Sequence, residues 1–369
     1  MIIKKRGGFF LIILFVMILV PGYGQYKFQS VFKDLSGAAL LTKLVENYKP
    51  GVVLDYGQAK DTLYARIYNE NDTVYGVYTR YGLYLPAGVD PSTYLYNGGS
   101  GINAEHTFPR SKGAAEGNAK SDMHHLFPAK VNVNEKRGSL PFNDIDDNLT
   151  NDWYYKNIVL HHIPEQNIDA YSERMPQYFE PREDHKGNVA RAMFYFYTMY
   201  KTEADKADKN YFKKQKEILC KWHFQDPVDS LEWVRTWQIA KYQEGKPNPF
   251  VLDCSLASRT YCDFISDACK TADTKEVWDN DVLHLVLFPV PAGDILNVRM
   301  VNPGISKVRL TVIDMLGRTI YHKSRHLGGG EIETFSIKIQ DLKKGNYILK
   351  VSGVEGEHFV NAYRLFSVQ

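Results

Sequence analysis

The residues best suited to chemistry lie in one polar, histidine-rich stretch between residues 102 and 142. It holds an acid next to a histidine, Glu105-His106, and a carboxamide, Asn134, together with several basic side chains. Hydrolysis of a phosphodiester needs a general base that activates water and a cation that stabilises charge on the phosphate and the leaving oxygen. An imidazole with its ordinary pKa of about 6.5 accepts a proton at neutral pH, and Glu and Asn supply the oxygen ligands that a hard cation prefers. The stretch therefore favours metal-assisted cleavage of phosphodiester bonds.

Three short motifs follow one another inside this stretch. They are Asn103-x-Glu105-His106 with Pro109 after it, Asp-Met-His-His-Leu-Phe-Pro-Ala from Asp122 to Ala129, and Val133-Asn134-x-x-Arg137-Gly138. In this order they resemble the endonuclease I family of secreted and periplasmic nucleases, which belongs to the ββα-metal (His-Me finger) group. Residues 187–195 and 226–251 resemble the family's core helix and its closing helix and loop, so the resemblance covers about residues 26–269.

The resemblance implies a role for each motif residue. His106 would be the general base, and Glu105 and Asn134 would hold one divalent cation, with Mg²⁺ expected and Mn²⁺ or Ca²⁺ as substitutes. It also implies a strand–strand–helix core, with His106 near a strand end and Asn134 on the helix. Adjacent residues of a strand face opposite ways. Glu105 and His106 can therefore share a site only if the strand ends or bends there.

Other residues in or beside the motifs are expected to assist. Asp122, His124 and His125 are expected to hold the proposed base and metal ligands in position. Two adjacent histidines rarely chelate one metal, so one of them is expected to orient His106 or Asn134. Arg110 and Arg137 are expected to contact substrate phosphates, against the alternative that these charges are simply solvated.

The elements that must position these residues can be read from the apolar spacing. It predicts helices at 35–48, 186–201 and 228–243, a strand at 74–79 and a glycine-rich loop at 97–101. The aromatic residues at 193–200 follow helical spacing, so they are expected in the core rather than at a base-stacking surface. We expect an α+β fold in which helices surround the ββα-metal core.

The first residues have the pattern of an export signal. Three basic residues precede an apolar run from Phe9 to Val20 and a small-residue cleavage site, so residues 1–24 are predicted to be a signal peptide. The run is shorter than the roughly 20 apolar residues of a membrane span, which disfavours the alternative of an uncleaved anchor. Export favours disulfides between Cys220, Cys254, Cys262 and Cys269, although spacing cannot choose the pairing and a zinc cluster is the alternative.

A second domain is expected after the nuclease-like region at 25–269. Residues 270–283 are polar and charged, as in a linker. Seven short alternating runs follow, which is typical of a β-sandwich at 284–369; they lie at 282–288, 295–300, 307–313, 318–323, 332–339, 346–352 and 359–367. Stretches at 288–298, 312–318 and 342–349 resemble the type A sorting domain of the type IX secretion system. The alternative is an ordinary sandwich used for adhesion or carbohydrate binding.

Composition limits the remaining choices. A formal net charge of +2 excludes a polybasic protein, so any nucleic-acid site must be a local patch. The prediction is a monomeric, secreted or surface-located endonuclease of low sequence specificity, which acts on DNA or RNA and meets the secretion machinery through its C-terminal domain. The alternatives are an adhesin or a non-catalytic nucleic-acid-binding protein, and a zinc hydrolase.

Overall fold

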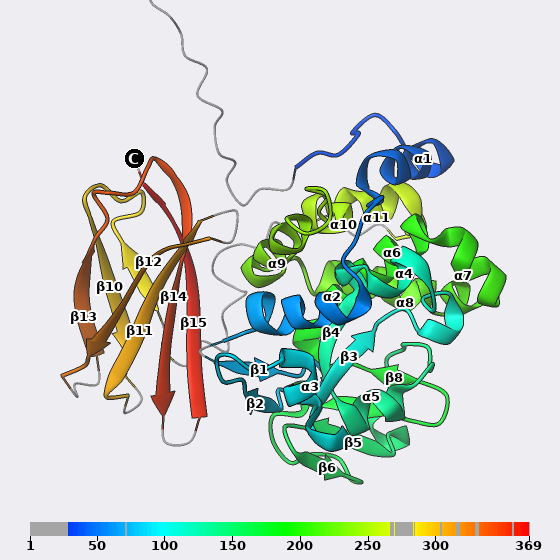
Figure 1. Cartoon of the computed structure of the whole chain (residues 1–369), viewed down its shortest axis with the longest axis horizontal. Coiled ribbons are helices and arrows are strands. Elements are labelled where there is room, and N and C mark those ends of the chain that lie inside the picture. Colours follow the sequence, from blue (N-terminus) through cyan, green and yellow to red (C-terminus); the bar gives the residue numbers. More distant parts are fainter. Residues whose placement is uncertain are drawn as a thin grey trace, which may run out of the picture.

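The computed structural model describes residues 29–70, 72–265, 269, 283, 285–302, 305–314, 318–328, 332–355 and 358–368. The predicted signal peptide at 1–24 lies outside these residues, as does all of the predicted linker except Leu283. Figure 1 shows a lobe of helices and short sheets beside a C-terminal lobe made of strands. The predicted α+β class is therefore correct.

A strand–strand–helix unit lies at the centre of the first lobe. Strands β3 (Ile102–His106) and β4 (Leu126–Lys130) are antiparallel, and helix α5 (Val131–Arg137) begins directly after β4. The register places Glu105 opposite Phe127 and His106 opposite Leu126. Strand β3 ends at His106, which is the condition under which Glu105 and His106 can reach one site.

Helix α6 (Lys186–Met199) forms the interior of this lobe, because all but one of its 14 residues are buried. Around it lie α1 (Gly37–Tyr48), α7 (Lys201–Asp208), α8 (Tyr211–Gln225), α9 (Ser230–Ala240), α10 (Pro249–Leu252) and α11 (Ser255–Thr260). The predicted helices at 35–48, 186–201 and 228–243 are confirmed in α1, α6 and α9, and the aromatic residues of α6 are core residues as expected.

Short elements complete the lobe. They are helices α2 (Tyr56–Thr62), α3 (Pro91–Tyr96) and α4 (Gly117–Ser121), the hairpin β1 (Thr73–Tyr75) and β2 (Gly82–Tyr84), and the sheet of β5 (Asp152–Tyr155), β6 (Ile158–Leu160), β7 (Ser172–Arg174) and β8 (Phe179–Glu180). The predicted strand at 74–79 is wrong in its second half. The chain turns after Tyr75 to pair with β2, and the turn carries Tyr78 toward β3.

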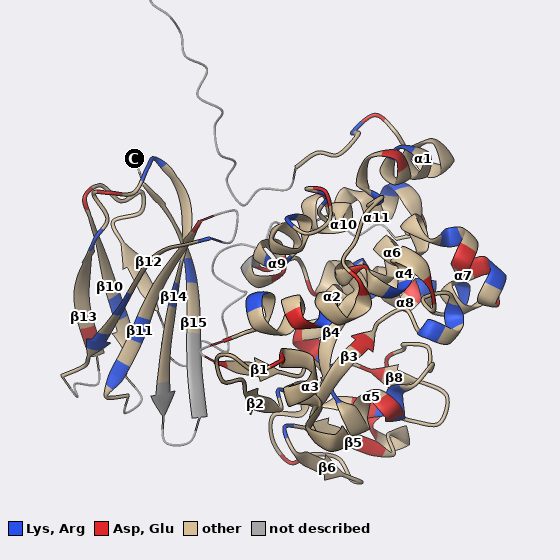
Figure 2. Ribbon diagram, viewed as in Figure 1, with Lys and Arg blue, Asp and Glu red and all other residues tan. Residues whose placement is uncertain are grey.

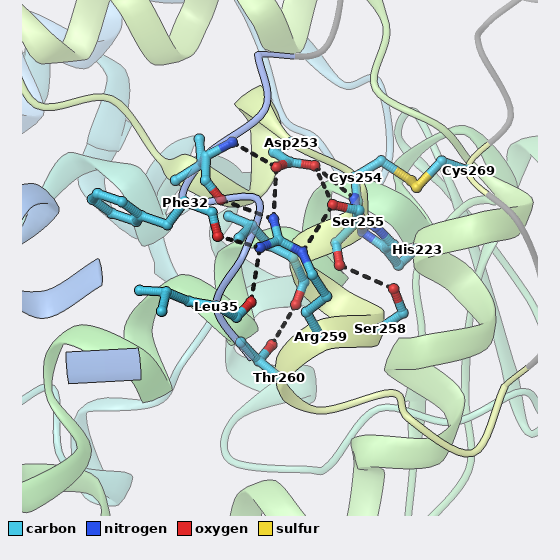
Figure 3. A network of polar contacts seen from close by, with 12 residues as sticks. Phe32, Leu35, His223, Asp253, Cys254, Ser255, Ser258, Arg259, Thr260 and Cys269 are labelled. Carbon is cyan, nitrogen blue, oxygen red and sulfur yellow. Dashed lines mark hydrogen bonds and ion pairs between the residues drawn. A yellow bond between two sulfur atoms is a disulfide. The ribbon is translucent and has the colours of Figure 1, made fainter. Parts of the chain in front are cut away.

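Two disulfides close the first lobe. Cys220 pairs with Cys262 and Cys254 with Cys269, so the predicted disulfides are confirmed and the zinc-cluster alternative is wrong. Figure 3 shows the network beside the second disulfide, in which Arg259 donates to the carbonyls of Phe32 and Leu35 and pairs with Asp253 at 2.8 Å. This network ties the N-terminal segment to the helices that end the lobe.

The C-terminal lobe contains the predicted β-sandwich. Its described strands are β9 (Val286–Phe288), β10 (Ile295–Val301), β11 (Lys307–Asp314), β12 (Thr319–His326), β13 (Ile332–Lys338), β14 (Gly345–Glu355) and β15 (His358–Val368). They form sheets of order β13-β10-β9 and β12-β11-β14-β15, with an apolar core between them. Val234 of α9 packs on Ile348 and Tyr363, so the larger sheet touches the first lobe.

Among the residues that the structure describes, no helix combines the length and the apolar character that crossing a membrane requires.

Candidate active site

One pocket joins the residues that the motifs singled out. Glu105 and His106 at the end of β3, Asn134 on α5 and Arg110 just beyond β3 all line a pocket of about 690 Å³. Lys, Arg, Asp and Glu are otherwise interspersed over the lobe rather than gathered by sign (Figure 2). The pocket is therefore the place where an acid, a histidine, a carboxamide and a cation converge.

The tautomer of His106 follows from one hydrogen bond. Its Nε2 lies 2.9 Å from the carbonyl oxygen of Lys120, which can only accept, so Nε2 carries the proton and Nδ1 keeps its lone pair. The ring contacts those of Tyr56 and His125, each 5.4 Å away between centroids. Burial lowers the pKa of His106 to about 4, with the Lys120 carbonyl opposing this shift, so the ring is neutral at neutral pH.

Glu105 is buried beside a hydroxyl and a guanidinium. Its Oε1 accepts a hydrogen bond from Tyr78 Oη at 2.8 Å and lies 3.2 Å from Arg137 Nη1. Burial raises the pKa of Glu105, while the Arg137 charge and the Tyr78 hydrogen bond oppose the rise. Within the described part of the chain, both contacts use the same oxygen, so Oε2 is available to a ligand.

Asn134 is held by its amide nitrogen. Nδ2 donates to Asn103 Oδ1 at 2.7 Å and to the Ala104 carbonyl at 3.3 Å. Both bonds use donors, which leaves the amide oxygen of Asn134 as an acceptor beside Glu105 in the pocket. The role of Asn103 as the partner of Asn134 was not predicted, although Asn103 opens the first motif.

The donor set suits a hard cation held by few protein ligands. Glu105 and Asn134 offer a carboxylate and a carboxamide oxygen in one pocket, which fits Mg²⁺ because this ion keeps several waters and takes phosphate oxygens. In contrast, no group of three or more His, Cys, Asp or Glu side chains among the described residues could hold a metal ion. A zinc site needs at least three such ligands, so the zinc-hydrolase alternative has no support here.

Only one of the three predicted supporting residues touches His106. His125 contacts the His106 ring and lies 2.7 Å through its Nε2 from the Ala119 carbonyl. His124 instead bonds the Lys246 carbonyl. Asp122 is fully buried and accepts four hydrogen bonds, from Tyr195, Tyr200, Gln243 and the backbone of His124. Asp122 and His124 therefore stabilise the turn that leads into β4 rather than the base itself.

The two predicted phosphate-binding arginines have different environments. Arg110 is exposed and lines the pocket, as a substrate contact should. Arg137 is fully buried, and its guanidinium bonds the carbonyls of His106 and Thr107 and pairs with Glu105. A phosphate cannot reach a guanidinium enclosed in this way. The sequence-based role of Arg137 therefore has to be corrected to that of a buried cation that holds Glu105 and the end of β3.

Several residues of the site carry no recognisable sequence signal. Tyr78 lies 27 positions before its partner Glu105, in a run that was predicted as a strand. The Lys120 contact to His106 uses a backbone carbonyl, which no side-chain pattern can reveal. Tyr56 contacts His106 from helix α2. These contacts arise from packing between segments that are distant in the chain.

Comparison with known proteins agrees with this architecture. Residues 38–254 match the model of the Endonuclease I family, and residues 286–360 match that of the secretion system C-terminal sorting domain. Over 164 aligned positions the chain is 36% identical to an extracellular ribonuclease of Bacillus subtilis, covering 40% of this chain and 50% of that protein. It is 29% identical over 140 positions to a periplasmic deoxyribonuclease of Aeromonas hydrophila, covering 38% of this chain and 51% of that protein.

The chain spans about half the length of these curated relatives. The relatives and the sorting domain support secretion or a surface location. The two family matches fall inside the predicted ranges 25–269 and 284–369. The chain belongs to the Endonuclease I family and carries a C-terminal sorting domain.

Proposed function

We propose that this protein is an exported, metal-dependent endonuclease that hydrolyses phosphodiester bonds in DNA or RNA with low sequence specificity. The observation that carries the proposal is that His106, Glu105 and Asn134 line one pocket together with the exposed cation Arg110. The names of its relatives, one a ribonuclease and one a deoxyribonuclease, support both classes of substrate.

In the proposed reaction, His106 Nδ1 takes a proton from water as the water oxygen attacks phosphorus. The bond from phosphorus to the leaving ester oxygen breaks, and that oxygen takes a proton from solvent. The hydrogen bond from Nε2 to the Lys120 carbonyl keeps the ring in the required tautomer. Arg110 holds the phosphate by charge at the mouth of the pocket. A cation bound by Glu105 and Asn134 would neutralise charge on the phosphate and on the leaving oxygen.

Cleavage assays test this proposal. Plasmid DNA and a structured RNA are each incubated with the purified protein and Mg²⁺. We expect nicking and fragmentation in Mg²⁺, complete loss of cleavage in EDTA and recovery when Mg²⁺ is returned in excess. The Glu105→Gln and Asn134→Ala variants should need more Mg²⁺, because each loses one of two proposed protein ligands. Cleavage that persists in EDTA, or an unchanged Mg²⁺ titration in both variants, would remove the cation from the proposal.

Export is proposed to use both ends of the chain, the signal peptide at 1–24 and the sorting domain at 284–369. Deletion of 284–369 should leave an active nuclease in vitro, because every residue proposed for catalysis lies in the first lobe. In a host with the matching secretion system, the truncated protein should accumulate in the periplasm instead of the medium.

Cell fractionation with a nuclease assay measures both effects. Full-length protein with His106→Ala is the control, since it should be inactive but released normally. A truncated protein that still reaches the medium would contradict the sorting role. A truncated protein that is folded but inactive would show that the C-terminal lobe, whose Ile348 and Tyr363 pack on Val234, contributes to catalysis.

A further inference from the structure

The pocket extends beyond the residues that the proposed reaction uses. From Glu105 and His106 it continues along a wall built by helices α2 and α3, which contributes Tyr56, Lys60 and Tyr96. Apart from Glu105, the charged residues that line the pocket are the cations Lys60 and Arg110. The wall therefore offers positive charge and aromatic rings next to the site of hydrolysis.

The Tyr56 ring contacts two lysine ammonium groups as well as His106. Lys60 Nζ lies 5.2 Å and Lys120 Nζ 5.0 Å from the centroid of the Tyr56 ring, which itself contacts His106. Among the described residues, neither lysine forms an ion pair with a carboxylate within 4 Å. Two cations that contact one ring and have no carboxylate within 4 Å favour an anionic ligand, and a phosphate flanking the scissile one carries that charge.

Tyr96 supplies an aromatic surface farther along the same wall. The residue is 48% exposed although it lines the pocket, so part of it is open to a ligand. A base in a duplex has both faces covered by its neighbours, whereas an unpaired base can stack on an aromatic ring. An exposed tyrosine beside phosphate-binding cations is thus suited to a single strand.

We propose that the α2–α3 wall is a subsite for an unpaired nucleotide next to the scissile phosphate. Lys60 of this wall binds its phosphate together with Lys120 of α4, which lies beside Tyr56 but does not line the pocket, and Tyr96 stacks on its base. This inference rests on the proposed nuclease function and assigns that function a preference for single-stranded nucleic acid.

Binding is measured separately from cleavage to test this subsite. A short fluorescein-labelled oligodeoxynucleotide, either single-stranded or annealed to its complement, is titrated with the His106→Ala protein in EDTA so that it stays intact. In this background, Tyr96→Ala should weaken single-strand binding about 5- to 150-fold and leave duplex binding unchanged. Tyr96→Phe should bind as the parent does, because the ring is kept.

Tyr94→Ala is the matched control, because Tyr94 lies on the same helix and is 45% exposed but does not line the pocket. It should bind both probes normally. Lys60→Gln and Lys120→Gln should each lower the slope of log affinity against log salt by about 0.7, as expected for one phosphate contact on a single strand. Lys221 is exposed on α8 and lies outside the pocket, so Lys221→Gln should leave this slope unchanged.

The possible outcomes show whether the subsite proposal or the nuclease proposal has failed. Equal binding by the Tyr96→Ala and Tyr94→Ala proteins, or equal losses with single strand and duplex, would overturn the subsite even if the unmutated protein cleaves plasmid. If that protein fails to cleave but Tyr96→Ala selectively loses single-strand binding, the subsite stands and the nuclease function is wrong.

Discussion

Replacing His106 with alanine should reduce cleavage by about 10²- to 10⁴-fold, the usual cost of losing a general base. The reason is geometric, because His106 is the histidine that lines the pocket with Glu105 and Asn134 and its Nδ1 is left unprotonated by the bond to Lys120. The loss should fall on kcat rather than KM, since Arg110 and the pocket walls are unchanged. Rates on plasmid DNA under saturating Mg²⁺ measure it.

Two other histidine variants serve as controls. His161 is 73% exposed and outside the pocket, so His161→Ala should cleave at the parent rate. His125→Ala removes the ring packed on His106 and a bond to Ala119, so it should lower both stability and rate. Parent-like activity of the His106→Ala protein would show that another group is the base. A folded His125→Ala protein with greater loss than His106→Ala would point to His125 instead.

The strand–strand–helix unit could be predicted because its determinants are local. The three motifs lie in order within one stretch, and β3, β4 and α5 form from that same stretch. Glu105, His106 and Asn134 consequently meet in one pocket as the motif resemblance implied. The described strands of the C-terminal lobe were predictable for a similar reason, since alternation along runs such as β10 and β11 records which residues face the sandwich core.

What the sequence did not reveal depends on contacts between distant segments. Tyr78 reaches Glu105 only because the chain turns after Tyr75, where alternation had favoured a longer strand. The disulfide pairing could not be chosen from spacing, because it depends on how α8 and α11 approach one another. The misjudged environment of Arg137 has the same origin, since its burial is created by Tyr211 and Phe142, which lie outside the third motif.

Replacing Arg137 with alanine should lower the free energy of unfolding by about 3–5 kcal/mol, the usual cost of removing one partner of a buried ion pair. The guanidinium is fully buried, pairs with Glu105 at 3.2 Å and donates to two carbonyls at the end of β3. Burial alone would lower the pKa of Arg137, but Glu105, Tyr211 and Tyr78 together outweigh burial and raise the pKa, so the guanidinium stays charged. Urea denaturation measures the loss.

Arg110→Ala is the matched control, because Arg110 lines the same pocket but is exposed. It should change stability by less than about 0.5 kcal/mol and weaken substrate binding instead.

The double variant Arg137→Met with Glu105→Gln should recover part of the stability lost in Arg137→Met alone, because it removes both buried charges together. An Arg137→Ala protein that is as stable as the parent but binds nucleic acid poorly would restore Arg137 as a phosphate contact. The opposite behaviour of the two arginines would show that burial, rather than membership of a motif, decides which cation meets the substrate.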